Sequence, residues 1–494
     1  MKNLKYLFFV ITIVTIFGCK KGYEGSLSSN PNPETFMAIN KIERSGENRL
    51  TTRVDAYWWG TSSNGYVVGF EVSIDSMKTW TYTTRTDSSI LLIIQQGSDT
   101  ADIDVFVRAI DNNGQKDLTP ASLKYPVRNS APSIFMANIA GKKPTVSFPA
   151  VHFFWTTNDA DGLQDIDGFD VFLNDTTSSA YTLQSSVLDI TIQADTSFSN
   201  ECFVYTGTKL NALSLKIKGL KYDSMNYFYV RAFDKAGLRS KFAKDSIFIK
   251  KPKSKTLFIN GYLTSRNAPQ NFISTRISSF VPSFDLLLIN DYNSLLSTYT
   301  EQAPDVLTQA RIFSFFNKII WISDEGATSN TLALAQQSTD LFFENGGRMF
   351  MMCNFGSDIQ NESDYFGFTP IQKLASDPSG LAIRMNVNDL VTPFDNSWPT
   401  LKCNTIISSA RPFYTQTASS GTSNFDSIYN ASLITLGTSG VNPWLGQSNV
   451  ISKRISLKYN RTVLVFMSLP IQNLNGNNNA NVFLDKVLKT ELGF

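Results

Sequence analysis

The sequence VRAIDNNG occupies residues 107–114, and a close copy, VRAFDKAG, occupies residues 230–237. A second pair lies upstream in the same order, GFEVSID at residues 69–75 and GFDVFLN at residues 168–174. Each block also has a tryptophan on a strand-like run before its first motif, Trp58-Trp59 in one and Trp155 in the other. Two matches in the same order indicate a duplicated module. The motifs start 38 residues apart in the first copy and 62 in the second, so the second copy contains an insertion of 24 residues.

The local pattern in both copies is typical of β-structure. Ile103, Val105 and Val107 occupy alternate positions, and Asp-x-x-Gly turns follow the strand-like runs. Short strands separated by turns over about 100 residues favour a β-sandwich. Both copies resemble fibronectin type III domains, over residues 34–128 and 132–250. The resemblance implies a buried early tryptophan in each sandwich and names no ligand.

The periodicity changes after the basic linker at residues 250–255. Continuous apolar runs at 256–260, 284–289, 318–322 and 348–352 suit strands that are buried on both faces of a parallel sheet. Helix-like stretches lie between them, notably at residues 304–316 and 331–344. The sequence therefore predicts an α/β domain over residues 255–494, with a doubly wound, mostly parallel sheet.

This region resembles class I glutamine-amidotransferase-like domains. The sequence FFENGGRMFMMCNFG at residues 342–356 has their order of helix, Gly-Gly, apolar strand and cysteine, and residues 462–470 and 480–492 resemble the closing strand and helix of degenerate members. We expect an irregular β-rich insertion around residues 380–450. The elbow at Cys353 is one residue too long, and no histidine follows His152. A nucleophilic thiolate needs a base or a cation beside it, so we expect Cys353 to be a small buried residue in a non-catalytic domain.

Polar residues follow the predicted parallel strands. In open α/β sheets, ligands bind in the crevice at the carboxyl ends of the strands. Carboxylates there can perform acid–base chemistry, hold a metal ion or bind sugar hydroxyls. The alternative is that polar residues begin loops wherever strands end. The candidate ligand-binding residues are Asn260, Asp291, Asp324, Glu325, Cys353 and Asn354.

The N-terminus has the features of an export signal. Lys2 and Lys5 precede an apolar run at residues 6–17, which is shorter than the roughly 20 residues of a membrane-spanning helix. The run ends at Gly18-Cys19 and resembles a bacterial lipobox, although Phe17 is bulkier than usual. The resemblance implies that residues 1–18 are removed and that Cys19 is lipidated. The composition of the following stretch, rich in Ser, Asn and Pro, predicts a flexible tether over residues 19–33. By the same resemblance to Gram-negative lipoproteins, Lys20 instead of an aspartate after Cys19 implies the outer membrane, and the sequence does not distinguish its periplasmic face from its outer face. The alternative is an ordinary cleaved signal in which Cys19 has no role.

Charge and residue counts restrict the function further. Without Lys2 and Lys5, the 44 basic residues become 42, which equals the 42 acidic residues, and this balance argues against a nucleic-acid partner. His152, the single histidine, lies on an apolar strand and receives no role. Cys353 and Cys403 either form a disulfide within the C-terminal domain or remain free thiols. The sequence contains no Cys-x-x-Cys motif of the kind that binds zinc. The aspartates at residues 159–167 form either a calcium loop or a polar turn. The sequence predicts no cofactor and no metal.

Together these observations predict a lipid-anchored binding or scaffold protein of the cell envelope. The two sandwiches would form a stalk, and the α/β domain would bind a glycan or an envelope protein without catalysis. The alternative is an envelope hydrolase that acts on glycan or peptide with strand-end carboxylates.

Overall fold

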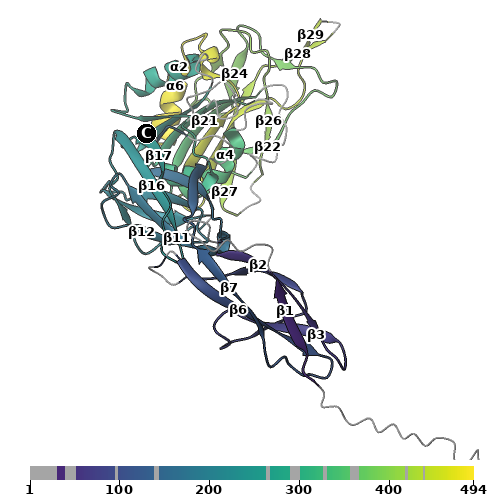
Figure 1. The fold of residues 1–494 in the computed structure, drawn as a ribbon. Helices are drawn as coiled ribbons and strands as arrows, with labels where there is room; N and C mark the ends of the chain where they lie inside the picture. The colour runs from purple at the N-terminus through teal and green to yellow at the C-terminus, as the bar shows by residue number, and fades with distance from the viewer. Residues whose placement is uncertain are drawn as a thin grey trace, which may run out of the picture. The chain divides into compact units, whose positions relative to one another are not determined.

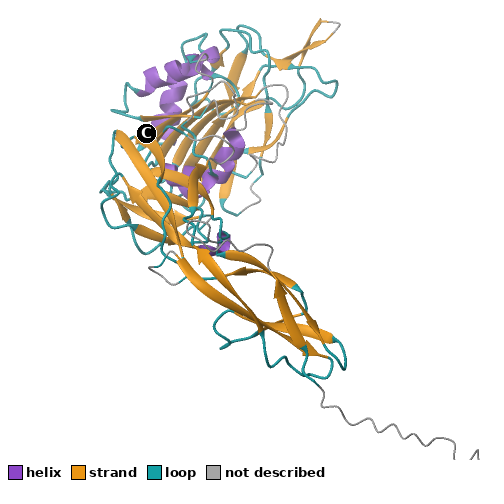
Figure 2. Cartoon of the chain, viewed as in Figure 1, coloured by secondary structure: helices purple, strands orange, loops and turns teal. Residues whose placement is uncertain are grey.

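The computed structural model describes residues 31–38, 50, 52–94, 98, 100–137, 144–207, 209–262, 267–289, 301–325, 331–355, 367–417, 421–437 and 440–494. The chain divides into two compact units. The first contains residues 1–132, 158–166 and 233–239, and the second contains residues 133–157, 167–232 and 240–494. Strands dominate both units (Figures 1 and 2). None of the helices in the described ranges has the length and apolar character needed to cross a membrane.

The first module consists of two antiparallel sheets that enclose an apolar core. Trp58, Phe70 and Tyr125 are buried in this core together with alternate residues of the longest strand, Val105, Val107 and Ala109. One sheet has the order β1-β2-β5 and the other β4-β3-β6-β7. The strands are β1 (Glu34–Ala38), β2 (Arg53–Thr61), β3 (Val67–Ser73), β4 (Thr81–Thr83), β5 (Asp87–Leu91), β6 (Thr100–Asp111) and β7 (Ala121–Arg128).

The second module repeats this plan with more strands. Its two five-stranded sheets have the orders β15-β14-β13-β10-β8 and β12-β11-β16-β17-β9. The strands are β8 (Ser133–Ala137), β9 (Val146–Ser147), β10 (Ala150–Asn158), β11 (Ile166–Leu173), β12 (Tyr181–Gln184), β13 (Asp189–Ala194), β14 (Glu201–Thr206), β15 (Ile217–Lys218), β16 (Ser224–Asp234) and β17 (Ala243–Ile249). The two sandwich modules confirm the fibronectin type III-like architecture predicted from the repeat.

The strand pairing locates the insertion in the second copy. Strand β12 pairs with β11 as β4 pairs with β3, and β13 pairs with β10 as β5 pairs with β2. Strands β14 and β15 follow β13 and have no counterpart in the described part of the first copy, where β6 follows β5. The inserted residues therefore extend one edge of the sheet that contains β10.

The repeated motifs are neighbours within each sheet. Strand β3 pairs with β6, with Glu71 opposite Arg108, and the two side chains form an ion pair at 2.6 Å. Strand β11 lies beside β16, and Asp170 and Arg231 form the equivalent ion pair at 3.0 Å. The acidic residue of the first motif and the arginine of the second thus form the same ion pair in both copies. The sequence analysis did not identify this pairing, although both residues stand at fixed positions in the motifs.

The C-terminal domain is built on a nine-stranded sheet with the order β19-β18-β20-β21-β31-β30-β27-β24-β25. The first five strands pair in parallel and the remaining pairs are antiparallel. The parallel strands are β18 (Thr256–Gly261), β19 (Asp285–Leu288), β20 (Lys318–Glu325), β21 (Arg348–Phe355) and β31 (Arg461–Met467). The others are β24 (Leu390–Pro393), β25 (Leu401–Lys402), β27 (Ser423–Ala431) and β30 (Asn449–Ser456).

The expected doubly wound, mostly parallel sheet is therefore not supported in that form. The segment expected to be a β-rich insertion, around residues 380–450, supplies three of the antiparallel strands and the start of β30, and these strands belong to the same nine-stranded sheet. Strand β30 pairs along β31, from Ile451 opposite Met467 to Ser456 opposite Arg461. The edge of β31 that is not paired with β21 thus continues the same sheet instead of ending it.

The α-helices are short and lie beside the nine-stranded sheet (Figure 2). Ile273 and Ile277 of α2 and Phe483 of α6 are buried in one core with Phe258 and Phe350 of the parallel strands. The predicted helix stop is also present, because α5 ends at Glu344 and Gly346 adopts a φ of 78° that favours glycine. The helices are α2 (Ala268–Ile277), α3 (Val306–Phe313), α4 (Thr331–Ser338), α5 (Asp340–Glu344) and α6 (Ala480–Asp485).

Within the second unit, helix α3 lies along strand β13 of the sandwich. The Thr191 and Thr308 hydroxyls lie 3.1 Å apart, and Gln193 donates a hydrogen bond of 3.0 Å to Ser314. His152 lies on β10 opposite Thr191, with its Nδ1 atom 3.2 Å from that hydroxyl and 3.2 Å from the Asp305 carboxylate. His152 is buried and therefore has a structural position between the sandwich and the helix.

We expect Asp305 to stabilise this contact in a pH-dependent way. Asp305 is the N-cap of α3 and accepts a hydrogen bond from the Thr308 amide. Burial raises the pKa of Asp305, but the neighbouring His152 and the hydrogen bonds from Thr308 outweigh burial and lower the pKa below 3.8. The charge of Asp305 thus stabilises the fold above pH 3.8, and this contribution is lost as the pH falls through the lowered pKa.

Chemical unfolding between pH 2 and 7 tests this expectation. Asp305→Asn keeps a good N-cap and should be less stable than the wild type only above the lowered pKa, whereas Asp305→Ala should lose about 1 kcal/mol more through the missing cap. A stability difference between the wild type and Asp305→Asn that persists unchanged at pH 2 would contradict the assignment.

Candidate functional site

The carboxyl ends of the parallel strands form the edge at which the sequence predicts a ligand site. Strands β20 and β21 run in register here, with Ser323 opposite Cys353 and Asp324 opposite Asn354. Asn354 donates a hydrogen bond of 2.9 Å to the Asp324 carboxylate. Both of these side chains are half-buried, so the pair lies at the boundary between the core and the surface. Of the predicted residues, Asp324 and Asn354 are brought together most directly.

Asn260 is committed to its own turn. Its side-chain oxygen accepts a hydrogen bond of 2.9 Å from the Tyr262 amide, and its Nδ2 atom donates one of 2.6 Å to Gln270 of α2. The side chain is only 2% exposed. Asn260 therefore holds the end of β18 against α2, and its role in ligand binding stays a prediction.

Two of the predicted residues lie beyond what the structure describes. Asp291 falls outside the described residues. Glu325 is the last residue of β20, but its side chain is not described. Their proposed contribution to the site stays a prediction.

Cys353 occupies a buried position rather than a reactive one. Its side chain is fully buried, and its sulfur lies 3.0 Å from the Ser323 hydroxyl. The single histidine of the chain, His152, contacts Thr191 and Asp305. The arrangement therefore gives Cys353 a hydroxyl neighbour, while the one imidazole of the chain contacts other residues.

The three cysteines in the described part of the chain form no disulfide with one another. Cys202, Cys353 and Cys403 are all buried and unbridged, so the bridge between Cys353 and Cys403 that the sequence left open is not formed. Burial, together with the nearby Asp195 carboxylate, raises the pKa of Cys202 to about 12, and burial also raises the pKa of Cys403. Both groups are therefore neutral thiols at physiological pH.

A pocket of about 380 Å³ lies elsewhere in the second unit, beside helix α3. Its wall includes Asn317 and Gly347, which directly precede β20 and β21, so this part of the pocket adjoins the amino ends of these strands. Arg311 of α3 also lines it and stacks over the Tyr205 ring at 3.8 Å. The sequence analysis predicted no residue of this pocket.

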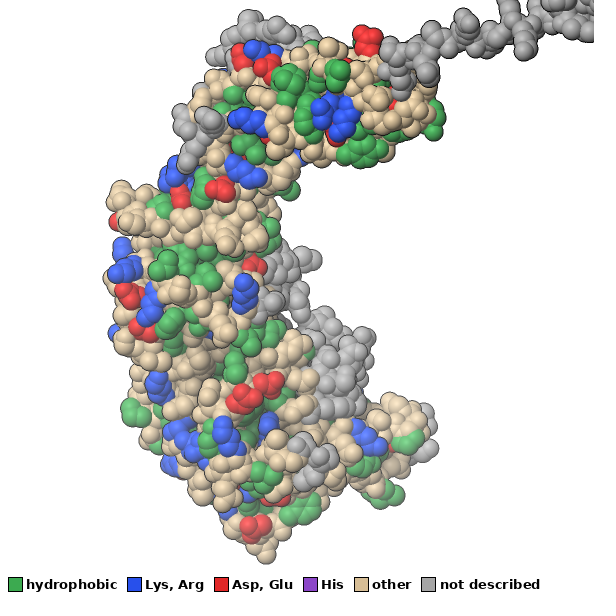
Figure 3. All heavy atoms as spheres, turned by 90° about the horizontal axis from the view of Figure 1, so that it is seen from below, with side chains coloured by type: hydrophobic (Ala, Val, Ile, Leu, Met, Phe, Trp, Pro, Cys, Tyr) green, Lys and Arg blue, Asp and Glu red, His purple; other side chains and the backbone are tan. Residues whose placement is uncertain are grey.

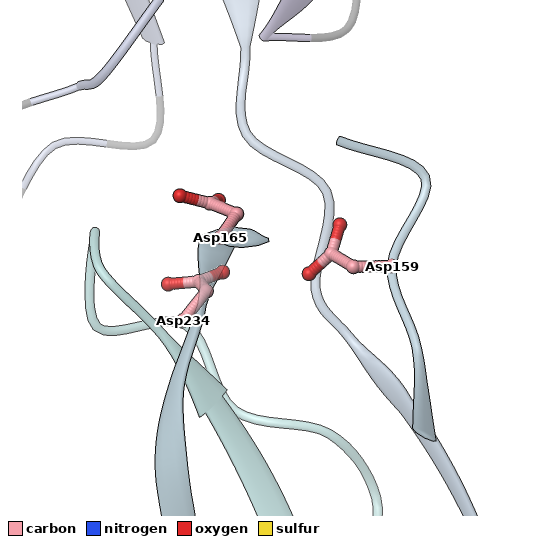
Figure 4. Close-up of side chains that lie close together, drawn as sticks. All are labelled: Asp159, Asp165 and Asp234. Atoms are coloured by element: carbon pink, nitrogen blue, oxygen red, sulfur yellow. The ribbon is translucent and has the colours of Figure 1, made fainter. Parts of the chain in front are cut away.

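The aspartate-rich loop between β10 and β11 forms a second polar centre, within the first unit (Figure 4). Asp159 and Asp165 come from this loop, and Asp234 comes from the end of β16. One side-chain oxygen from each lies within 4.8 Å of the other two, and all three residues are buried. Burial and the carboxylates of Asp161, Asp165 and Asp234 raise the pKa of Asp159 to about 6, against the hydrogen bond from the Asp161 amide.

No known protein family matches this sequence, and no curated protein matches it. Three solved structures illustrate the similarities that were found. Fibronectin(III)-like modules of Clostridium thermocellum CbhA are 11% identical, cover 44% of this chain and 95% of their own, and have a TM-score of 0.16. The chicken CNTN1 FN1–FN3 domains are 11% identical, cover 46% of this chain and 69% of their own, and have a TM-score of 0.18. A tetra-tandem repeat from the extending region of a large adhesion protein is 14% identical, covers 44% of this chain and 49% of its own, and has a TM-score of 0.18. The sandwich architecture itself is defined by the strand pairing given above.

Proposed function

We propose that this chain is a lipid-anchored binding protein of the cell envelope. In this proposal Cys19 carries the anchor, the two β-sandwich modules form a stalk, and the C-terminal domain binds a glycan at the carboxyl ends of its parallel strands. The observation that carries the non-catalytic part is the full burial of Cys353 against Ser323 without an imidazole nearby.

We relate the C-terminal domain to degenerate class I glutamine-amidotransferase-like domains. The five parallel strands β19-β18-β20-β21-β31 support this relation, as do the Gly346-Gly347 helix stop and the position of Cys353 on β21. The antiparallel extension and the missing base depart from the family. In this proposal the C-terminal domain shares the fold of the family but does not hydrolyse glutamine.

The chemistry of the strand-end edge favours a polyhydroxylated ligand. Asp324 and Asn354 offer a carboxylate and an amide side by side, and such groups can accept and donate hydrogen bonds to vicinal hydroxyls. On the face shown in Figure 3, basic and acidic side chains are interspersed in both units, so this face has no region of a single charge that would favour a strongly charged ligand over a neutral glycan. A second candidate, hydrolysis of an envelope glycan, uses the same carboxylates, and the assay below separates the two.

Sedimentation with purified peptidoglycan sacculi tests the binding role. We expect the wild-type chain to sediment with the sacculi, and Asp324→Asn to weaken sedimentation several-fold because it removes the charged partner of Asn354. Asp426→Asn, an exposed carboxylate on β27 of the same domain, is the matched control and should behave as the wild type. Release of soluble sugar fragments that Asp324→Asn abolishes would show a hydrolase instead. A wild-type chain that stays in the supernatant would exclude sacculi as the ligand.

Thiol labelling tests the absence of cysteine chemistry. We expect iodoacetamide to modify Cys353 slowly in the native chain at pH 7.5 and rapidly after denaturation, because the native side chain is fully buried. Cys353→Ala should leave sedimentation unchanged, and the wild type should not hydrolyse glutamine. Mass spectrometry of the labelled peptides gives the rates. Rapid native labelling of Cys353, together with an activity that is lost in Cys353→Ala, would contradict the proposal.

A further inference from the structure

The cluster of Asp159, Asp165 and Asp234 is composed of groups that rarely share a buried space. Their exposed fractions are 6%, 4% and 1%. In Figure 4 the Asp159 carboxylate points from its loop toward the side chains of Asp165 and Asp234. Buried carboxylates are normally paired with a cation or protonated, because an isolated buried charge is strongly disfavoured. The burial of Asp159 beside two further carboxylates therefore requires an explanation.

A second observation is that two buried oxygens at the cluster lack a donor. Neither the Asp159 Oδ2 atom nor the Asn129 Oδ1 atom has a hydrogen-bond partner among the described residues. Asn129 is 5% exposed, and its Nδ2 atom donates a hydrogen bond of 2.7 Å to the Asp234 carboxylate, which places this amide against the cluster. A buried acceptor without a donor is unfavourable, and a bound cation would satisfy both oxygens.

Asp161 has a different role in the same loop. Its two carboxylate oxygens accept hydrogen bonds from the Thr52 amide at 2.6 Å and the Ser130 amide at 2.7 Å. These bonds attach the loop at residues 158–166 to the first module, and one of the two donors, Ser130, directly follows Asn129 in the sequence. Asp161 thus positions the loop, whereas Asp159 and Asp165 face the cluster.

The duplicated turn in the first module serves as an internal comparison. Asp111 stands at the position equivalent to Asp234, and its Oδ1 atom accepts hydrogen bonds of 2.9 Å from the amides of Asn113 and Gln115. Its Oδ2 atom accepts a hydrogen bond from Ser62. Both oxygens of Asp111 are therefore satisfied by neutral donors, as expected for a polar turn. Asp234 keeps the equivalent bond to the Leu238 amide, but its other oxygen faces Asn129 and the cluster.

The donor set and its spacing indicate which cation would fit. Carboxylate and amide oxygens are hard ligands, and the cluster contains no cysteine or histidine that would favour zinc. Calcium binds oxygen at about 2.3–2.6 Å, so two ligands on opposite sides of the ion lie roughly 4.8 Å apart. The oxygens of Asp159, Asp165 and Asp234 lie within that limit of one another. Magnesium, at about 2.0–2.1 Å, would require a tighter cluster.

We infer that Asp159, Asp165 and Asp234, together with the side-chain oxygen of Asn129, form a calcium-binding site in the first unit. The ion would join three segments that are distant in sequence, namely the end of the first module at Asn129, the loop at residues 158–166 and the turn at residues 233–239. All three segments belong to the same compact unit.

Calorimetric titration of the full chain, stripped with EDTA, tests the inference directly. We expect one calcium ion per chain and a melting temperature that rises with calcium concentration, because a ligand that binds only the folded state stabilises it. Magnesium should bind at least tenfold more weakly. No calcium binding by the wild type, or tighter binding of magnesium, would overturn the calcium assignment.

The substitution Asp159→Asn distinguishes a metal ligand from a purely structural residue, because the difference in melting temperature between the variant and the wild type should reverse between EDTA and calcium. In EDTA the variant should melt at or above the temperature of the wild type, because it removes a buried charge that has no donor on one oxygen. In calcium it should melt below the wild type and bind calcium at least tenfold more weakly. Asp111→Asn is the matched control and should leave calcium affinity unchanged, whatever its effect on stability.

Two results from these variants would overturn the site. One is equal calcium affinity in Asp159→Asn and the wild type. The other is an equal loss of affinity in Asp111→Asn, which would indicate an indirect effect of folding. If Asp159→Asn fails to fold, Asp165→Asn provides the same comparison, and the wild-type stoichiometry decides the question independently of any variant.

Discussion

Replacing Trp58 by alanine is expected to lower the free energy of unfolding of the first unit by about 3–5 kcal/mol. The side chain is 1% exposed and lies between the two sheets of the first module. Its ring makes an edge contact with Phe70 at 6.4 Å, and its indole nitrogen donates a hydrogen bond of 2.8 Å to the Arg85 carbonyl. The substitution would remove the ring, leave a large cavity and leave the Arg85 carbonyl without a hydrogen-bond donor. The loss in free energy of unfolding should therefore be among the largest that a single substitution causes.

The adjacent residue provides the matched control. Trp59 points to the other side of β2, is 49% exposed and stacks on Phe36 at 5.6 Å. Trp59→Ala should cost less than about 1 kcal/mol, because its ring is already half in water. Urea unfolding followed by circular dichroism gives both values. Equal losses for the two variants would contradict the placement of Trp58 in the core.

The sandwich modules could be predicted because their signals are local and duplicated. Trp58 meets Phe70 and Trp155 meets Phe169 with nearly the same edge geometry, at interplanar angles of 65° and 67°. The phenylalanine is the second residue of each GF motif, so the sequence already contained both partners of the pair. A pattern that occurs twice separates residues required by the fold from residues that merely happen to be apolar.

The extension of the C-terminal sheet could not be predicted in the same way. Strand β27 pairs with β30 through two register shifts and has exposed positions at Asn424 and Asp426. Such a strand lacks the continuous apolar character that identified the parallel strands. Its membership in the sheet depends on pairing between segments and not on its own composition.

The candidate sites show the same limit. Asp324 and Asn354 could be placed together because parallel neighbours in register bring strand ends to one edge. The Asp159 loop could be recognised as polar, but Asp234 and Asn129 join it from other parts of the chain. A signal for Asp234 was nevertheless present, since the duplicated turn places an aspartate at the end of the strand in both copies.

Replacing Cys19 by serine is expected to transfer the protein almost completely from the membrane fraction to the soluble fraction. Cys19 lies outside the described residues, and the expectation comes from the apolar run at residues 6–17 that ends at Gly18-Cys19. In the lipobox interpretation, Cys19 is the only attachment point for the acyl chains. Each buried methylene contributes about 0.8 kcal/mol, so several chains anchor a protein stably where a single chain would not. Serine cannot form the thioether, and the whole of this contribution would be lost at once.

Metabolic labelling with a fatty-acid analogue and fractionation of cells should be carried out on the same cultures. We expect label and membrane association in the wild type and neither in Cys19→Ser. Cys202→Ala, which removes a thiol buried in the second sandwich, is the control and should retain both. If the wild type takes up no label, the alternative of an ordinary cleaved signal gains support, and the mature N-terminus measured by mass spectrometry would then lie at a residue other than Cys19. If Cys19→Ser loses its label but remains with the membrane, the anchor is not the acyl chain, and attachment must then come from a surface of the folded chain.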